Sequence, residues 1–214
     1  MADEGDRRMA IADTAIAIIS ERGVRALTHR AIDQHLALPA GSTSYYFRSR
    51  HALLKAVVAR LAERTEEDLR SMREGGRGGI VTPGEEPAPG LAVRIELWSR
   101  AAGALLDRMI GERRADSMAR YSLTLELATD PELHRILTAG QPIRQFAESQ
   151  FNRLGAEDPA AAATDLVSFA DGLVFDSLAG TRSLTAPPPG SAASVDQLSR
   201  AVRTFLNGVF CRDL

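Results

Sequence analysis

Apolar residues recur at helical spacing along almost the whole chain. Near the start, Met9, Ala12, Ile16 and Ile19 lie three or four positions apart, as on one face of an α-helix. We find no convincing stretch in which apolar and polar residues alternate with a period of two, which is the pattern of a half-buried strand. The chain also contains no internal repeat. The pattern therefore predicts an all-α protein.

Four helices with short breaks are predicted in the N-terminal part. Gly23 suits the end of the first helix, and Thr28 suits the start of the second, where its hydroxyl accepts an otherwise unpaired N–H. Pro39 suits the first position of the third helix, because that N–H has no intrahelical partner. Ser49 is expected to cap the fourth. The predicted helices cover residues 7–22, 28–36, 39–47 and 50–72.

Residues 75–90 contain six glycines and three prolines. This composition predicts a flexible loop over residues 74–90. We expect the loop to separate an N-terminal domain at residues 5–62 from a helical domain at residues 91–214.

Helical patterns resume after the loop. Asp130 and Asp158 each precede a proline, which is a start signal for a helix. Ser194 and Gln197 have the spacing of a capping box for the last helix. A bend is expected near Gly140 and Pro142, and a Pro/Gly turn at 185–191. The predicted helices cover residues 91–109, 112–129, 131–154, 159–180 and about 194–210.

The charge of the chain is divided unevenly. The net charge is −2 overall, yet residues 22–60 carry seven basic side chains and one acid, Asp33, or +6. The remaining 19 basic and 27 acidic residues give −8. A basic module on an acidic body suggests attraction to a polyanion. The alternative on charge alone is an unevenly charged solvated surface.

Composition argues against several other classes of protein. The one cysteine, Cys211, permits no disulfide within the chain and no cysteine-based metal cluster, and it suits a reducing cytoplasm. No apolar run approaches the roughly 18 residues of a membrane span. Gly76 and Gly78 are followed by Val81 where a dinucleotide fingerprint needs glycine, and other catalytic motifs are missing. We therefore expect a cytoplasmic protein that is not an enzyme, without metal or cofactor.

Two short helices joined by a tight turn in a basic segment make a helix-turn-helix candidate. The motifs Ala26-Leu27-Thr28-His29-Arg30-Ala31-Ile32, Leu36-Ala37-Leu38, Gly41-Ser42, Tyr45-Tyr46-Phe47, Ser49-Arg50 and Ala52-Leu53-Leu54 resemble those of the TetR family of repressors. The resemblance covers about residues 7–62. It implies an N-terminal three-helix helix-turn-helix domain and a C-terminal helical domain for effector binding and dimerisation.

The resemblance implies a DNA-contacting surface on the second, third and fourth helices. The small residues at the start of the recognition helix suit close approach to base edges, the tyrosines suit phosphates, and Arg30 suits a guanine. Arg50 matches a position where the family has a phosphate-binding lysine or arginine, and the backbone amides at the start of that helix also favour a phosphate. Phe47 is interpreted as a core anchor. The candidate residues are His29, Arg30, Pro39, Ala40, Gly41, Ser42, Thr43, Tyr45, Tyr46 and Arg50.

The sequence departs from the family pattern in three places. Thr43 and Ser44 replace a usual Leu-Tyr pair, so either the aromatic contact moves to Tyr45 or that position faces solvent. Pro39 replaces a common Ser or Thr cap. The glycine-rich segment at 75–90 is longer than usual.

The C-terminal part is expected to hold a small-molecule effector and to form a homodimer through about residues 159–180 and 194–210. Large or polar side chains on the middle helices are the effector candidates: Trp98, Arg120, Tyr121, Phe146, Phe169 and Asp171. The chain is thus interpreted as a regulator of a palindromic operator in double-stranded DNA, with repressor as the family default. The alternative is a helical protein-interaction module without sequence-specific DNA binding.

Overall fold

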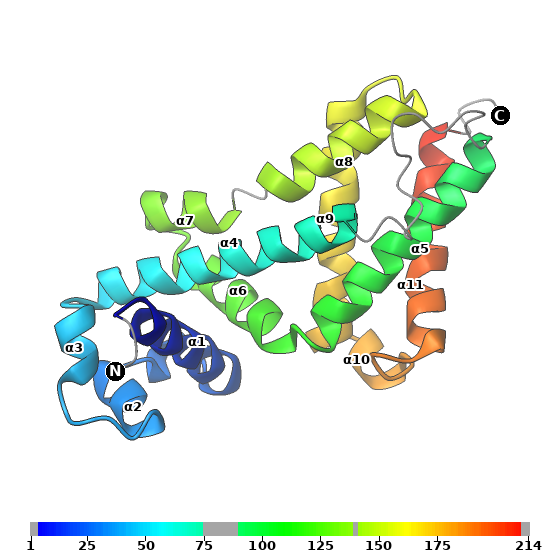
Figure 1. The fold of residues 1–214 in the computed structure, drawn as a ribbon. Helices are drawn as coiled ribbons and strands as arrows, with labels where there is room; N and C mark the ends of the chain where they lie inside the picture. Colours follow the sequence, from blue (N-terminus) through cyan, green and yellow to red (C-terminus); the bar gives the residue numbers. More distant parts are fainter. Residues whose placement is uncertain (1–3, 75–89, 139–140, 211–214) are drawn as a thin grey trace. The chain divides into compact units, whose positions relative to one another are not determined.

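The computed structural model describes residues 4–74, 90–138 and 141–210. All regular elements in these ranges are helices, and no strand occurs among them, which confirms the all-α prediction (Figure 1). The elements are α1 (Glu4–Arg22), the 3₁₀ helix η1 (Val24–Ala26), α2 (His29–His35), α3 (Ser42–Tyr46), α4 (Arg50–Glu74), α5 (Leu91–Ile110), α6 (Arg114–Glu126), α7 (Pro131–Thr138), α8 (Gln141–Leu154), α9 (Pro159–Ala179), α10 (Arg182–Thr185) and α11 (Ala192–Phe210).

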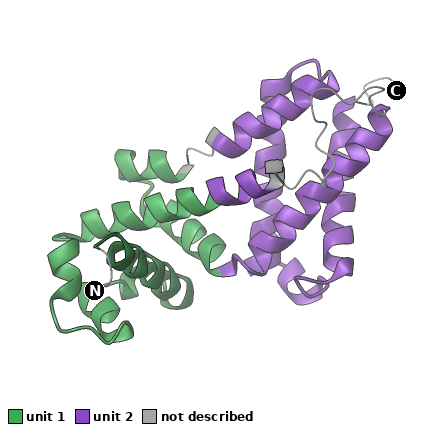
Figure 2. Ribbon diagram, in the orientation of Figure 1, with its two compact units in different colours: residues 1–65, 115–139 green, residues 66–114, 140–214 purple. Residues whose placement is uncertain are grey.

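The chain divides into two compact units (Figure 2). The first unit comprises residues 1–65 and 115–139, and the second comprises residues 66–114 and 140–214. The units meet between residues 65 and 66 inside α4, between residues 114 and 115, and between residues 139 and 140. None of these boundaries falls in the glycine-rich segment that we expect to separate the domains. Apart from its first and last residues, that predicted loop lies outside the described residues.

The first unit has one apolar core, to which α6 and α7 also contribute. Ala12, Ile16 and Ile19 of α1 are at most 4 % exposed, as their periodicity predicts, whereas Met9 at the start of that stripe is 44 % exposed. Leu123 of α6 and Leu133 of α7 are fully buried in the same cluster. Because apolar side chains of α6 and α7 are buried in this core, the unit extends beyond the predicted range of 5–62.

Two predicted helix caps of the first unit are confirmed. Thr28 Oγ1 accepts a hydrogen bond from the Ala31 N–H at 3.0 Å, and Ser49 Oγ accepts one from the Ala52 N–H at 3.1 Å. Each bond satisfies an N–H that has no partner within its own helix.

The third helix starts later than the sequence predicts. Pro39 and Ala40 belong to the turn, and Gly41 precedes the helix with φ of +89°, a conformation that favours glycine. The Pro39 carbonyl accepts from the backbone N–H and the hydroxyl of Ser42, at 3.1 and 2.7 Å. The expectation that Pro39 opens the helix is therefore wrong.

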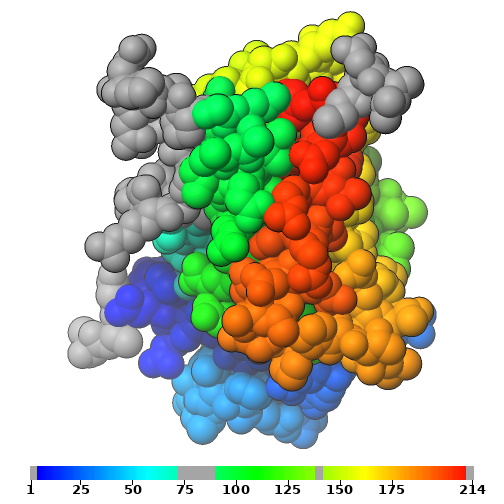
Figure 3. All heavy atoms as spheres, turned by 90° about the vertical axis from the view of Figure 1, so that its right-hand side faces the viewer, coloured from blue at the N-terminus to red at the C-terminus, as the bar shows by residue number. Residues whose placement is uncertain are grey.

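The second unit is built around two pairs of helices, α5 with α11 and α8 with α9. The α5–α11 pair lies side by side on the face shown in Figure 3. The approach is close at Gly103, where an added Cβ would lie 2.7 Å from the Ser199 backbone nitrogen. A residue without a side chain is required for this packing.

Helix starts in the C-terminal half are partly as predicted. Asp130 and Asp158 cap α7 and α9, each accepting backbone N–H groups at 3.0–3.1 Å. The last helix is instead capped by Ser191, whose Oγ accepts from the Ser194 N–H at 3.2 Å. Ser194 is buried inside α11, so the predicted capping box is wrong.

The single helix expected over 131–154 is two helices, α7 and α8, with residues 139–140 outside the described ranges. The short α10 was not predicted. Among the described helices, none is both long and apolar enough to cross a membrane.

Candidate DNA-binding surface and ligand cavity

A buried carboxylate fixes α3 against α2. Asp33, 4 % exposed, accepts hydrogen bonds from the N–H groups of Gly41 and Thr43, both at 2.8 Å, and from the Thr43 hydroxyl at 2.6 Å. These bonds satisfy amides at the start of α3, where the helix dipole also favours a negative charge. Asp33 therefore sets the angle between the two helices of the helix-turn-helix.

The same contacts determine the protonation state of Asp33. Burial raises the pKa of its carboxyl, but the hydrogen bonds from Thr43 and Gly41 together outweigh burial and hold the pKa below its usual value. Asp33 is thus a charged acceptor at neutral pH. The one acid of the basic segment has a structural role.

The exposed side of α3 and its preceding turn form a surface of small residues around one aromatic ring. Pro39, Ala40, Gly41 and Ser44 are exposed, and Tyr45 is 78 % exposed. Tyr46 is half-buried and meets Tyr45 edge to face, with ring centroids 5.2 Å apart. Small side chains let a helix lie close to base edges, and a phenol suits a phosphate oxygen.

Thr43 does not belong to that surface. Its side chain is completely buried and bonded to Asp33, so the expectation that it contacts DNA is wrong. The Thr43 hydroxyl donates to Asp33, which a leucine at this position could not do. Ser44 takes its place on the exposed side.

Two further DNA-binding candidates, Arg50 and His29, form hydrogen bonds within the first unit. The Arg50 guanidinium donates to the Val24 carbonyl at 2.8 Å and to the Leu27 carbonyl. His29 Nε2 lies 2.7 Å from the Phe47 carbonyl oxygen, to which it donates in the tautomer that carries its hydrogen on Nε2. Both side chains therefore hold α2, α3 and α4 together. Because the Arg50 side chain is already hydrogen-bonded, a phosphate at this position would be bound chiefly by the backbone amides at the start of α4.

The remaining cations on this side are available to solvent. Arg30 is exposed and forms no hydrogen bond or ion pair within the described ranges. Arg48, in the turn between α3 and α4, is exposed as well. We had not singled out Arg48, although its place two residues after the recognition helix was a usable signal for phosphate contact.

An ionic cluster fastens α6 to α1 and α4 within the first unit. Asp13 accepts from Arg60 Nε at 2.8 Å and lies 2.9 Å from Arg64 Nη2. Arg64 also pairs with Asp116 of α6. The cluster is only partly exposed, so its charges hold one another in defined positions.

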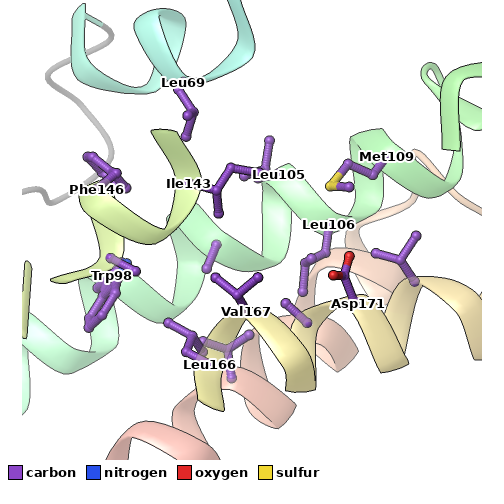
Figure 4. Close-up of a pocket in the computed structure, with 15 residues that line it drawn as sticks. Leu69, Trp98, Leu105, Leu106, Met109, Ile143, Phe146, Leu166, Val167 and Asp171 are labelled. Carbon is purple, nitrogen blue, oxygen red and sulfur yellow. The ribbon is translucent and has the colours of Figure 1, made fainter. Parts of the chain in front are cut away.

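The second unit contains a cavity of about 80 Å³ (Figure 4). It is lined from α4, α5, α8, α9 and α11, and apolar side chains dominate its wall. Concave apolar sites with few polar groups are typical of small-molecule binding.

Three of the six effector candidates line this cavity: Trp98, Phe146 and Asp171. Phe169 does not line it and stacks on Phe205 of α11, with centroids 5.3 Å apart. Arg120 donates to Thr65 Oγ1 at 3.0 Å in the first unit, to which Tyr121 also belongs. The sequence thus grouped residues that the structure places in different parts of the molecule.

Sequence reasoning missed most of the lining. The missed side chains are aliphatic or thioether groups at core-like helical positions, and no pattern separates a cavity wall from an ordinary core. They include Leu69, Leu105, Leu106, Met109, Ile143 and Leu166.

An exposed recognition helix in a basic module, joined in one chain to a helical unit with an apolar cavity, defines a helix-turn-helix transcriptional regulator. Residues 11–57 match the family of bacterial regulatory proteins named tetR, and residues 93–208 match the tetracyclin repressor-like C-terminal domain. The chain belongs to the TetR family of transcriptional regulators, which are DNA-binding proteins and not enzymes. A search of curated proteins found no match.

Solved structures share the fold. A transcriptional regulator from Rhodococcus sp. Rha1 is 17 % identical with a TM-score of 0.70, covering 95 % of both chains. A regulator from Saccharomonospora viridis in complex with choline is 18 % identical with a TM-score of 0.69, covering 95 % of this chain and 97 % of its own. The multidrug binding protein EbrR, complexed with malachite green, is 23 % identical with a TM-score of 0.57, covering 92 % and 98 %.

Proposed function

We propose that the chain is a repressor that binds a palindromic operator as a homodimer and leaves it when a small molecule occupies the cavity of the second unit. The observation that carries the proposal is the pairing of a fixed, exposed α3 with a separate apolar cavity. Two structurally similar proteins were solved with small molecules, choline and malachite green. Both support a small-molecule ligand for this chain.

The proposed mechanism of release depends on the distance between the two copies of α3 in the dimer. In a two-fold dimer, the two copies of α3 must lie roughly 34–36 Å apart to enter successive major grooves. A ligand that prefers another separation shifts the population away from the DNA-bound state.

Selection of DNA by the full chain from a random pool tests the proposed binding to a palindromic operator: one palindrome should be enriched. A folded protein that enriches no sequence would contradict it.

Arg30 is expected to read a base. Replacing Arg30 with alanine should cost about 1–3 kcal/mol of discrimination at one position of each half-site, because a bidentate guanidinium contact to guanine is lost. Competition binding with single-base operator variants measures this loss. Arg70→Ala, which removes the same charge from an exposed position in the second unit, is the control. A uniform loss over all operator variants would assign Arg30 to a phosphate instead.

The dimer is expected to use one face of α9. Ser168, Gly172, Phe175 and Ala179 recur every three or four residues and are all exposed, with Phe175 at 50 %. Small residues around one ring permit a partner helix to approach closely. These positions fall within the α9 segment for which we predict dimerisation.

Replacing Phe175 with arginine should therefore give a monomer in analytical ultracentrifugation. Operator affinity should fall by about two orders of magnitude, because the second half-site is no longer bound within the same complex. Leu125→Arg, at an 81 % exposed position of α6, controls for the loss of any exposed apolar residue. A Phe175→Arg dimer with normal operator affinity would contradict this interface.

A further inference from the structure

The wall of the cavity offers a ligand very few polar groups. Among the described residues that line it, only Asp171 has a side-chain oxygen and only Trp98 has a side-chain nitrogen. Figure 4 shows these two side chains on opposite sides of the cavity. Asp171 is exposed and already takes part in an interaction within the protein, so it is not a free partner for a ligand. The polar chemistry left to the cavity is that of one indole.

The indole of Trp98 has a donor without a partner. Trp98 is only 5 % exposed, and it forms no hydrogen bond with any residue that the structure describes. Edge-to-face contact with the fully buried Phe151, with ring centroids 4.8 Å apart, holds the indole in place. A buried tryptophan N–H usually has a hydrogen-bond partner, because an unpaired donor costs free energy. An unpaired N–H in the wall of a cavity is therefore suited to a ligand that brings an acceptor.

This wall discriminates between ligands by their polarity. An ion would lose its water on entry and would meet no free side chain of opposite charge in the described lining. A ligand with several polar groups would leave all but one of them unpaired. A hydrocarbon would suit the apolar wall but would leave the Trp98 N–H without an acceptor. A neutral ligand with one accepting oxygen satisfies both the wall and the indole.

We propose that the cavity selects a small neutral molecule with one hydrogen-bond acceptor, such as a ketone or ester oxygen, on an apolar body. The acceptor is bound by the indole N–H of Trp98. This inference rests on the proposed function, because it names the class of effector for the same cavity.

The apolar body must be small. The cavity volume of about 80 Å³ is roughly half the 150 Å³ of an engineered cavity that takes benzene in another protein. Leu105 and Met109 lie in the wall, and a flexible thioether adapts to an irregular ligand. A single aromatic ring with one short substituent is the largest body that modest repacking accommodates.

Trp98 also provides the signal that tests the proposal. It is the only tryptophan of the chain, so its indole N–H gives a single signal in a nitrogen–proton NMR correlation spectrum. A hydrogen bond moves the signal of such a proton downfield. Acetophenone and α-methylstyrene are the probes, because they have the same ring and shape and differ only in a C=O or a C=CH₂ group. The effect of the ligand's ring on the signal is therefore shared by both.

Saturation of the wild-type chain with acetophenone should move the indole signal downfield of its position with α-methylstyrene. This comparison needs no variant, so it decides even where a substitution prevents folding. If both probes bind and leave the signal at the same position, the inference is overturned and the proposed function stands. If neither probe alters the signal of the folded protein, the cavity takes no ligand of this size. The effector part of the proposed function then fails together with the inference.

The requirement for a neutral ligand is tested with benzoate and benzylammonium, which have the same ring and a similar size but carry opposite charges. In calorimetric titrations, both ions should bind more weakly than acetophenone by roughly tenfold or more, because neither charge finds a free partner in the wall. An ion that binds as tightly as acetophenone would overturn this requirement.

Variants then locate the hydrogen bond. Trp98→Phe keeps an aromatic ring and removes the N–H. It should weaken calorimetric binding of acetophenone about tenfold more than binding of α-methylstyrene, because the ketone oxygen then enters the cavity without a donor. Phe146→Leu, which alters the wall without removing a polar group, should weaken both probes by the same factor. Equal losses for the two probes in Trp98→Phe would overturn the assignment to the indole.

Discussion

Replacing Asp33 with alanine is expected to destabilise the first unit by roughly 3 kcal/mol and to abolish specific operator binding. The substitution leaves two backbone N–H groups and the buried Thr43 hydroxyl without their charged acceptor. It also releases the angle between α2 and α3, on which insertion into the major groove depends. Chemical denaturation followed by circular dichroism measures the stability, and fluorescence anisotropy with labelled operator measures the binding.

Two comparisons separate this role from a general effect of charge. Thr43→Val removes one of the three bonds and should cost about 1 kcal/mol. Glu21→Ala, at an exposed acid of α1, should be nearly neutral. An Asp33→Ala protein with wild-type stability and operator affinity would show that the contacts of Asp33 do not hold the motif.

The pH dependence follows from the lowered pKa of Asp33. A carboxyl with a lower pKa in the folded state contributes stability that is present above its unfolded pKa of about 3.9. That contribution is lost as the pH falls through the folded value. The stability difference between wild type and Asp33→Asn should therefore stay constant near neutral pH and shrink as the pH falls below about 4.

Replacing Gly103 with alanine is expected to destabilise the second unit by roughly 2–3 kcal/mol. Alanine normally favours a helix over glycine by about 1 kcal/mol. Here the new Cβ would lie 2.2 Å from Ser199 Oγ and 2.9 Å from Ser199 Cα, so α5 and α11 must move apart. Thermal unfolding compared with wild type measures the loss.

The backbone atoms of Ser199 distinguish this explanation from a simple side-chain clash. Ser199→Ala removes only the Oγ contact, so the double variant should stay destabilised. A stabilising Gly103→Ala would mean that α5 and α11 are not packed as closely as described.

The fold was largely predictable because its helices carry strong periodic stripes and side-chain caps. Thr28, Ser49, Asp130 and Asp158 accept backbone N–H groups as their positions predict. The start of α3 was not predictable from Pro39, because a glycine at positive φ two residues later sets the boundary. Local propensity indicates that a helix exists more reliably than where it begins.

The candidate site was predictable where function lies in exposed residues of a short motif. The errors in the predicted set of DNA-contacting residues arose from long-range polar contacts. The Thr43 hydroxyl donates to the buried Asp33, and the Arg50 guanidinium donates to a backbone carbonyl before α2. The sequence indicated only part of the cavity wall. Trp98, Phe146 and Asp171 were effector candidates because of their size or charge. Its aliphatic wall is indistinguishable from a core until the helices are packed.

The dissociation constant of the selected operator, with and without a saturated cavity, decides whether this chain is a ligand-released regulator. It should be measured at one fixed salt concentration, because phosphate contacts make affinity strongly salt-dependent. Saturation is established by titrating the small molecule and following the fluorescence of Trp98, which lines the cavity. We predict at least tenfold weaker operator binding at saturation, a coupling of about 1.4 kcal/mol. An unchanged constant at saturation would contradict coupling between cavity and DNA, and a tighter one would contradict release.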